Sequence, residues 1–178
     1  LFGILVTFSK EISTSMNIPV VNTPDVFLYA SIAMTLGDLG AGLISQFFRS
    51  RKKTLIGLIA VSFLSALYFS ILGVASKQAY IYTVTFIAFF CGYWAVLLTT
   101  TAESFGTNLR ATITTSVPNL IRGLAIPMNL IFVYIFKTLG FSAVQAATSV
   151  IFLFFSAAIL AVFYLPETFG RDLDFVEE

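Results

Sequence analysis

Long apolar runs alternate with short polar segments along the whole chain. Five runs reach the roughly 20 residues that an α-helix needs to cross a bilayer, and a shorter run opens the chain. The six predicted spans are residues 1–16, 26–48, 54–75, 80–102, 111–136 and 141–165. The pattern therefore predicts an all-α integral membrane protein with six transmembrane helices, followed by a tail over residues 166–178.

Composition supports a lipid environment. Hydrophobic residues make up 58% of the chain and charged residues only 11%, whereas soluble domains are about half apolar and about a quarter charged. The lipid bilayer, and not nucleic acid, is thus the expected partner. With no His and one Cys, the chain lacks the residues for His-based triads and the usual zinc sites. We expect no enzymatic activity, no cofactor and no metal.

The placement of cations predicts the orientation in the membrane. Six crossings put both ends and alternate connections on one side. That side carries six cations, whereas the other carries Lys77 and Lys137. The six are Arg49, Arg51, Lys52, Lys53, Arg110 and Arg171. By the positive-inside rule, we expect both ends to be cytoplasmic. We expect the protein to lie in the plasma (inner) membrane.

The connection between the second and third spans contains a recognisable motif. "GLISQFFRSRKK", residues 42–53, resembles the loop G-x-x-x-D-R/K-x-G-x-R/K-R/K of the major facilitator superfamily. Gly42, Arg51 and Lys52 match this pattern. The departures from it are Gln46, Phe47 and Arg49. Such departures are common in the second copy of the motif, which indicates a C-terminal half.

Two later segments resemble the sugar porter and organic-ion transporter branch of the same superfamily. "AESFGTNLRA", residues 102–111, is similar to the segment after the tenth helix, with Glu103 and Arg110 as its acid and base. "LPETFGRDLDFVEE", residues 165–178, is similar to the P-E-T-K-G-x-x-L tail, with Phe169 in place of Lys. The three motifs occur in family order across the whole chain.

The resemblance implies helices seven to twelve of a twelve-helix transporter, with residues 1–178 as its C-terminal transmembrane half. Such a half is two inverted three-helix repeats, and substrate binds near mid-membrane against an N-terminal six-helix half. Because the chain opens without Met in an apolar run, we expect it to be part of a longer protein and to need that half. The implied function is secondary active transport of a small polar organic metabolite, a sugar or an organic anion, by alternating access. Proton coupling is left open, and the alternative is a channel-like or scaffolding membrane domain.

Charged residues at the cytoplasmic helix ends are candidates for a gate. Ion pairs there can hold one arrangement of the helices closed and release it in another. The candidate gate network is Arg51, Lys52, Glu103, Arg110, Glu167 and Arg171.

Arg122 is a charge in an apolar span and the first candidate for substrate binding. It lies eleven residues into the span that starts at Ala111, which corresponds to a depth of roughly 16 Å, near the midplane. A charge at this depth usually faces protein or a wet cavity. Arg122 could contact an anionic substrate, form an ion pair with Asp38, or form an ion pair with an acidic residue in the N-terminal half.

Asp38 lies at similar depth in the second span, eleven residues before Arg49. It is a candidate for proton coupling, because burial raises and a nearby cation lowers the pKa of a carboxyl group. The alternatives are a fixed ion pair and a polar group that packs helices together.

The remaining candidates on the fifth span follow from helical spacing. Asn119 and Asn129 share a narrow face with Arg122. Pro118 and Pro127 flank Arg122 and predict a bend in that span.

Aromatic and N-terminal residues complete the set. Tyr93 and Trp94 could stack on a ligand, or could pack in the core. Lys10 could bind substrate or extend toward the membrane surface, and Glu11 is a second candidate for proton coupling. Since Lys10 and Glu11 are adjacent, their side chains diverge by about 100° on a helix, and we expect that they cannot both face the central substrate cavity.

Overall fold

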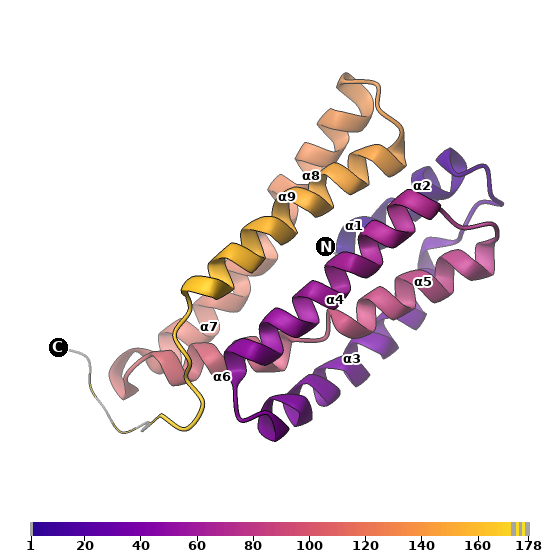
Figure 1. Ribbon diagram of the computed structural model, residues 1–178. Helices are drawn as coiled ribbons and strands as arrows, with labels where there is room; N and C mark the ends of the chain where they lie inside the picture. The colour runs from indigo at the N-terminus through magenta and orange to yellow at the C-terminus, as the bar shows by residue number, and fades with distance from the viewer. Residues whose placement is uncertain (1, 172–173, 175, 177–178) are drawn as a thin grey trace.

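The computed structural model describes residues 2–171, 174 and 176, and the regular structure in these residues is helical. Figure 1 shows the elements in chain order. They are α1 (Phe2–Thr7), α2 (Ser9–Ser15), α3 (Thr23–Phe47), α4 (Arg51–Leu72), α5 (Lys77–Phe90), α6 (Trp94–Ser104), α7 (Thr107–Gly123), α8 (Ala125–Val133), the π-helical turn η1 (Tyr134–Thr138) and α9 (Ala143–Tyr164).

Five helical segments in the described chain are long and apolar enough to cross a membrane. They are Thr23–Phe47, Arg51–Leu72, Lys77–Ser104, Thr107–Thr138 and Ala143–Tyr164. These segments match the second to sixth predicted spans to within about one helical turn at each end. The sequence therefore correctly predicts an all-α chain with long apolar helices of membrane-spanning length.

The first predicted span differs from the other five. The sequence predicts one helix over residues 1–16, but the described part contains two short helices, α1 and α2, which meet at Phe8. Their lengths are six and seven residues, too short for either to cross a bilayer alone.

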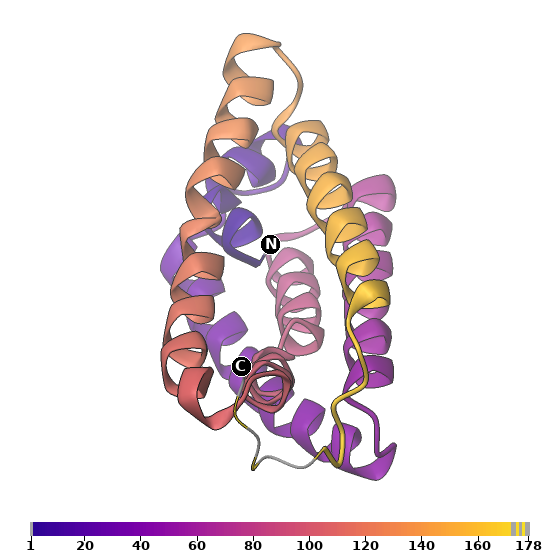
Figure 2. The ribbon, with the colours of Figure 1, turned by 90° about the vertical axis from the view of Figure 1, so that its left-hand side faces the viewer.

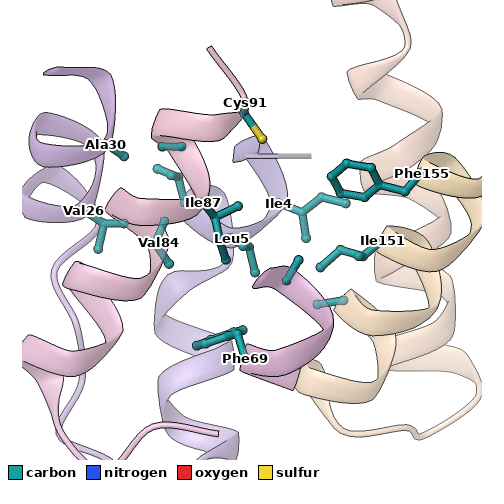
Figure 3. Close-up of a cluster of buried hydrophobic side chains, with 14 of the residues drawn as sticks. Ile4, Leu5, Val26, Ala30, Phe69, Val84, Ile87, Cys91, Ile151 and Phe155 are labelled. Atoms are coloured by element: carbon teal, nitrogen blue, oxygen red, sulfur yellow. The ribbon is translucent and has the colours of Figure 1, made fainter. Parts of the chain in front are cut away.

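The core lies where α1, α3, α4, α5 and α9 meet. Figure 3 shows Leu5, Phe69, Val84 and Ile151 converging from four of these helices. Tyr80 is buried beside them, and its hydroxyl donates a hydrogen bond to the carbonyl of Leu5 at 2.7 Å. A buried hydroxyl with such a partner avoids the cost of an unmade hydrogen bond, so α5 is held against α1.

Helices α7 and α8 lie along the opposite side of the molecule from α4 in Figure 2. Phe132 of α8 is a buried member of the core, whereas α7 contributes no buried residue. The main contact of α7 is with α6. Most of the surface of α7 is therefore left uncovered by the described part of this chain.

The segment Thr107–Thr138, which corresponds to the fifth predicted span, is interrupted at Leu124, between α7 and α8. Pro127 has no N–H to donate to the carbonyl of Gly123, which weakens the helix at this turn. Pro118 lies within α7 without ending it, so only one of the two prolines coincides with the break.

The segment Lys77–Ser104, which corresponds to the fourth predicted span, is interrupted at residues 91–93, between α5 and α6. Helix α6 therefore begins inside an apolar segment, far from both ends of that segment.

Candidate functional site

The two interior charges predicted from sequence line one pocket. It lies between α3, α6 and α7 and has a volume of about 370 Å³. Its lining residues are Ser31, Met34, Thr35, Asp38, Trp94 and Arg122. The pocket thus combines a carboxylate, a guanidinium, an indole and two hydroxyls at the level of the break between α5 and α6.

Asp38 is half-buried and makes a hydrogen bond to the backbone of a different helix. Its Oδ1 accepts from the amide N–H of Ala95 at 3.2 Å. Ala95 is the second residue of α6, and the first N–H groups of a helix have no acceptor within that helix. Tyr93, at the N-cap position, supplies no side-chain hydrogen bond. The carboxylate of Asp38 therefore caps α6 from the neighbouring helix α3.

Backbone contact brings Asp38 to this position. A Cβ atom built on Gly92 would lie 2.5 Å from the backbone nitrogen of Asp38 and 2.6 Å from the carbonyl oxygen of Met34. Only glycine fits at this crossing of α3 and the break before α6, as small residues allow close approach of membrane helices.

Arg122 lies over Trp94 in the same pocket. Its guanidinium carbon is 5.7 Å from the centroid of the Trp94 ring, within the range of a cation–π contact. Among the described residues, the guanidinium of Arg122 forms no ion pair, with Asp38 or with another acid. The direct Asp38–Arg122 pair considered from sequence is thus not formed in this structure.

Three other predicted substrate residues lie outside this pocket. Asn119 donates from Nδ2 to the carbonyl of Thr115 on its own helix at 3.0 Å. Asn129 is half-buried on α8 and is absent from the pocket lining. Tyr93 packs against the hydrophobic core, which favours the packing role over stacking on a ligand.

Lys10 and Glu11 line a second, separate pocket of about 360 Å³, together with Thr14, Ser15 and Phe136. The expectation from sequence concerned the central cavity, and neither residue lines the pocket of Asp38 and Arg122. The second pocket lies along α2 and beside Phe136 of η1.

The predicted gate network centres on Arg51 and Glu103. Nη2 of Arg51 lies 2.8 Å from Oε1 of Glu103, and the two side chains are 14% and 15% exposed. The other carboxylate oxygen of Glu103 accepts from the hydroxyl of Thr168 at 2.7 Å. Arg51 also donates from Nη1 to the hydroxyl of Ser45 at 2.8 Å, and its guanidinium lies over the ring of Phe169, 5.1 Å from the centroid. The network therefore ties α4, α6 and the tail together.

Glu167 caps α4 from the tail. Its carboxylate accepts from the N–H of Arg51 at 2.8 Å and from the hydroxyl of Ser50. It also accepts from the N–H groups of Thr168 and Phe169, both at 3.1 Å. Partial burial raises the pKa of Glu167, but the hydrogen bonds from the Ser50 hydroxyl and from backbone N–H groups outweigh it and hold the pKa below the ordinary value.

Arg110 and Lys52, two further members of the predicted network, bind backbone carbonyls. Nε of Arg110 donates to the carbonyls of Ala102 and Phe105 at 2.9 and 3.2 Å. Nζ of Lys52 donates to the carbonyl of Phe163 at 2.7 Å. The two cations therefore hold the ends of α6 and α9 by hydrogen bonds to the main chain.

Arg171, the last predicted member, lies at the end of the continuously described chain. Its backbone N–H donates to the carbonyl of Thr168 at 3.1 Å, which forms a turn in the tail.

Sequence reasoning missed several members of these sites. Ser50 carries a signal, because a Ser directly before a basic helix start is a common N-cap, and its hydroxyl does accept from the N–H of Lys53. No signal in the sequence marks Thr168 or Met34, since their roles depend on contacts between distant segments.

Comparisons of the chain with protein-family models, with curated proteins and with solved structures found no match. The resemblance to the major facilitator superfamily therefore rests on the three sequence motifs alone.

Proposed function

We propose that this chain is the C-terminal half of a secondary active transporter that moves a small polar organic metabolite carrying an anionic group. The observation that carries the proposal is the pocket shared by Asp38, Trp94 and Arg122. It lies at the level of a helix break inside an apolar segment, where a charge is costly unless it serves protein or ligand contacts.

Arg122 is the residue that we assign to the anionic group. Its guanidinium lies over Trp94 and has no acidic partner among the described residues. A guanidinium keeps its charge and presents a planar set of donors that matches a carboxylate. Trp94 then supports the guanidinium and offers an apolar surface to the rest of the metabolite.

The exposure of Arg122 supports a site that is shared with a second half. The residue is exposed on the surface of this chain, and α7, which carries it, has no buried residue. An exposed charge at bilayer depth needs protein or water in front of it. An N-terminal half packed against this face would close the substrate site. The same proposal includes two further points, namely that this chain consists of two inverted three-helix repeats and that the transporter lies in the plasma membrane.

The Arg51–Glu103 network supports an alternating-access cycle. It joins the ends of α4, α6 and the tail on what we propose is the cytoplasmic side, and it is only partly exposed. A network of this kind is stable in one arrangement of the helices and must break in another.

Counterflow in liposomes tests the proposal. The intact transporter, this chain joined to its N-terminal half, is assayed with a panel of carboxylates, sugars and organic cations. We expect saturable counterflow of a carboxylate, strong loss in Arg122→Ala and partial recovery in Arg122→Lys.

Lys137→Ala is the matched control, because it removes a cation from the same span outside the pocket. Ohmic conductance without saturation would support the channel alternative instead. Equal transport by wild type and Arg122→Ala would remove the assignment of Arg122. We expect no transport by the 178-residue chain alone, since it provides one side of the substrate site.

A further inference from the structure

Helix α6 begins inside the apolar segment Lys77–Ser104, where the N–H groups of its first turn have no acceptor within the helix. An unpaired N–H group in such a place is costly. The residue at the N-cap position, Tyr93, provides no side-chain acceptor. The acceptor comes from α3, because Oδ1 of Asp38 lies 3.2 Å from the N–H nitrogen of Ala95.

Two further observations show that this bond is built into the packing. Gly92 lies directly against the backbone of α3 around Asp38, with no room for a Cβ. Trp94, the residue between this contact and Ala95, is the one over which the Arg122 guanidinium lies. Asp38 therefore contacts the start of α6 at Ala95, and the neighbouring residue Trp94 contacts Arg122.

We propose that Asp38 is a positioning residue: it caps α6 across the helix interface and thereby fixes Trp94 beside Arg122. The cap requires an oxygen that accepts a hydrogen bond, and it does not require a proton to be gained or lost. This role differs from proton coupling, which requires a titratable group at residue 38. It rests on the proposed function only in treating the pocket as the substrate site, since the cap itself exists in the absence of transport.

Asparagine separates the two roles. Asn and Asp are about equally good as helix caps, whereas Ala is poor. Asp38→Asn therefore keeps a capping oxygen but removes the titratable group, and Asp38→Ala removes both. Thr35→Ala is the matched control, because Thr35 lines the same pocket but donates to the carbonyl of Ser31 on its own helix.

The readout is the fluorescence of Trp94, the single Trp of this chain. The intact protein is studied in nanodiscs, with every Trp of the N-terminal half replaced by Phe. We expect Asp38→Ala to shift the emission maximum and to increase quenching by acrylamide. Asp38→Asn and Thr35→Ala should both retain the wild-type emission. A wild-type spectrum in Asp38→Ala, or the same change in Asp38→Asn as in Asp38→Ala, would overturn the proposal.

Amide hydrogen exchange gives a second test, whose first part uses the wild-type protein alone. In the wild-type protein the N–H of Ala95 should be protected to the same degree as that of Leu97, which donates to the carbonyl of Tyr93 at 2.9 Å. In Asp38→Ala, exchange at Ala95 should rise about fivefold, as expected when a cap is lost. Rapid exchange at Ala95 in the wild type would show that the cap is not formed.

These outcomes are distinct from failure of the transport proposal. Trp94 fluorescence and Ala95 exchange are measured without substrate, so an inactive protein can still show the cap. Conversely, normal transport together with an unchanged Trp94 emission spectrum in Asp38→Ala would support the proposed function and contradict the positioning role of Asp38.

Discussion

Gly37 and Gly92 touch through their backbones where α3 crosses the break between α5 and α6. A Cβ atom on Gly37 would lie 2.0 Å from the carbonyl oxygen of Phe89 and 3.2 Å from the Cα of Gly92. The obstructing atoms belong to the backbone, so no change of side-chain rotamer can relieve the contact. The position of Asp38 depends on this crossing.

Alanine at either glycine is expected to destabilise the protein. Gly37→Ala and Gly92→Ala should each cost about 1–3 kcal/mol by overpacking, measured as a lower thermal unfolding midpoint in detergent. Gly42→Ala is the control, because it lies on the same helix as Gly37 and a Cβ atom built on it would meet nothing within 4 Å. That variant should be neutral or slightly stabilising, since Ala favours helix over Gly. Equal effects at Gly42 and Gly92 would contradict a backbone contact at this crossing.

The Arg51–Glu103 pair should contribute more than an exposed ion pair. Both partners are largely buried, so removing one leaves the other without its charge-assisted hydrogen bonds, at a cost of about 1.5–3 kcal/mol. Glu103→Gln and Arg51→Lys, combined in a double-mutant cycle, should show coupling in thermal unfolding. Lys53→Ala, a cation of the same connection without an ion pair in the described residues, should have little effect. Additive single and double variants would exclude coupling.

Acid should release the tail from α4. The pKa of Glu167 is lower in the folded protein than its ordinary value of 4.5, so its stabilising contribution is present above that value. The contribution is lost as the pH falls below 4.5 and through the lowered pKa. Limited proteolysis of the tail should therefore accelerate in this acidic range. Glu167→Gln should accelerate it at neutral pH, whereas Glu11→Gln, on the first part of the chain, should not. A pH-independent cleavage rate would contradict this assignment.

Pro127 is expected to maintain the break at Leu124. Pro127→Ala supplies the N–H that the carbonyl of Gly123 lacks, so α7 and α8 should join into a more continuous helix. Spin labels at Thr112 and Leu139, in a background with Cys91 replaced by Ser, should then report a longer and narrower distance distribution.

The matched control for this change is Pro118→Ala. It should leave the distance distribution unchanged, because α7 continues through residue 118. If only Pro118→Ala changed the distance distribution, Pro127 would not be the residue that maintains the break at Leu124.

The long helices are predictable from sequence because hydropathy depends on local composition. Five of the six predicted spans match helical segments. The helix-end positions and motifs indicate that Glu103 lies near a cation, but they do not decide between Arg51 and Arg110. The break before α6 leaves no decisive signal, since Gly92 in an apolar run is equally compatible with a continuous helix. The partner of Asp38 is beyond prediction because it is a backbone N–H, and every residue except Pro carries one.

The hydrogen bonds of Glu167 and Thr168 extend the folded unit beyond the end of α9. Hydropathy predicts the end of the last span at residue 165, and α9 ends at Tyr164. Yet Thr168 is fully buried, and with Glu167 it binds residues that lie 65 and 116 positions away in the sequence. A truncation or a fused reporter placed at the end of α9 would therefore remove structural parts of the folded unit. Because the N–H of Arg171 still donates to the carbonyl of Thr168 at 3.1 Å, the junction of an engineered fusion should lie no earlier than after Arg171.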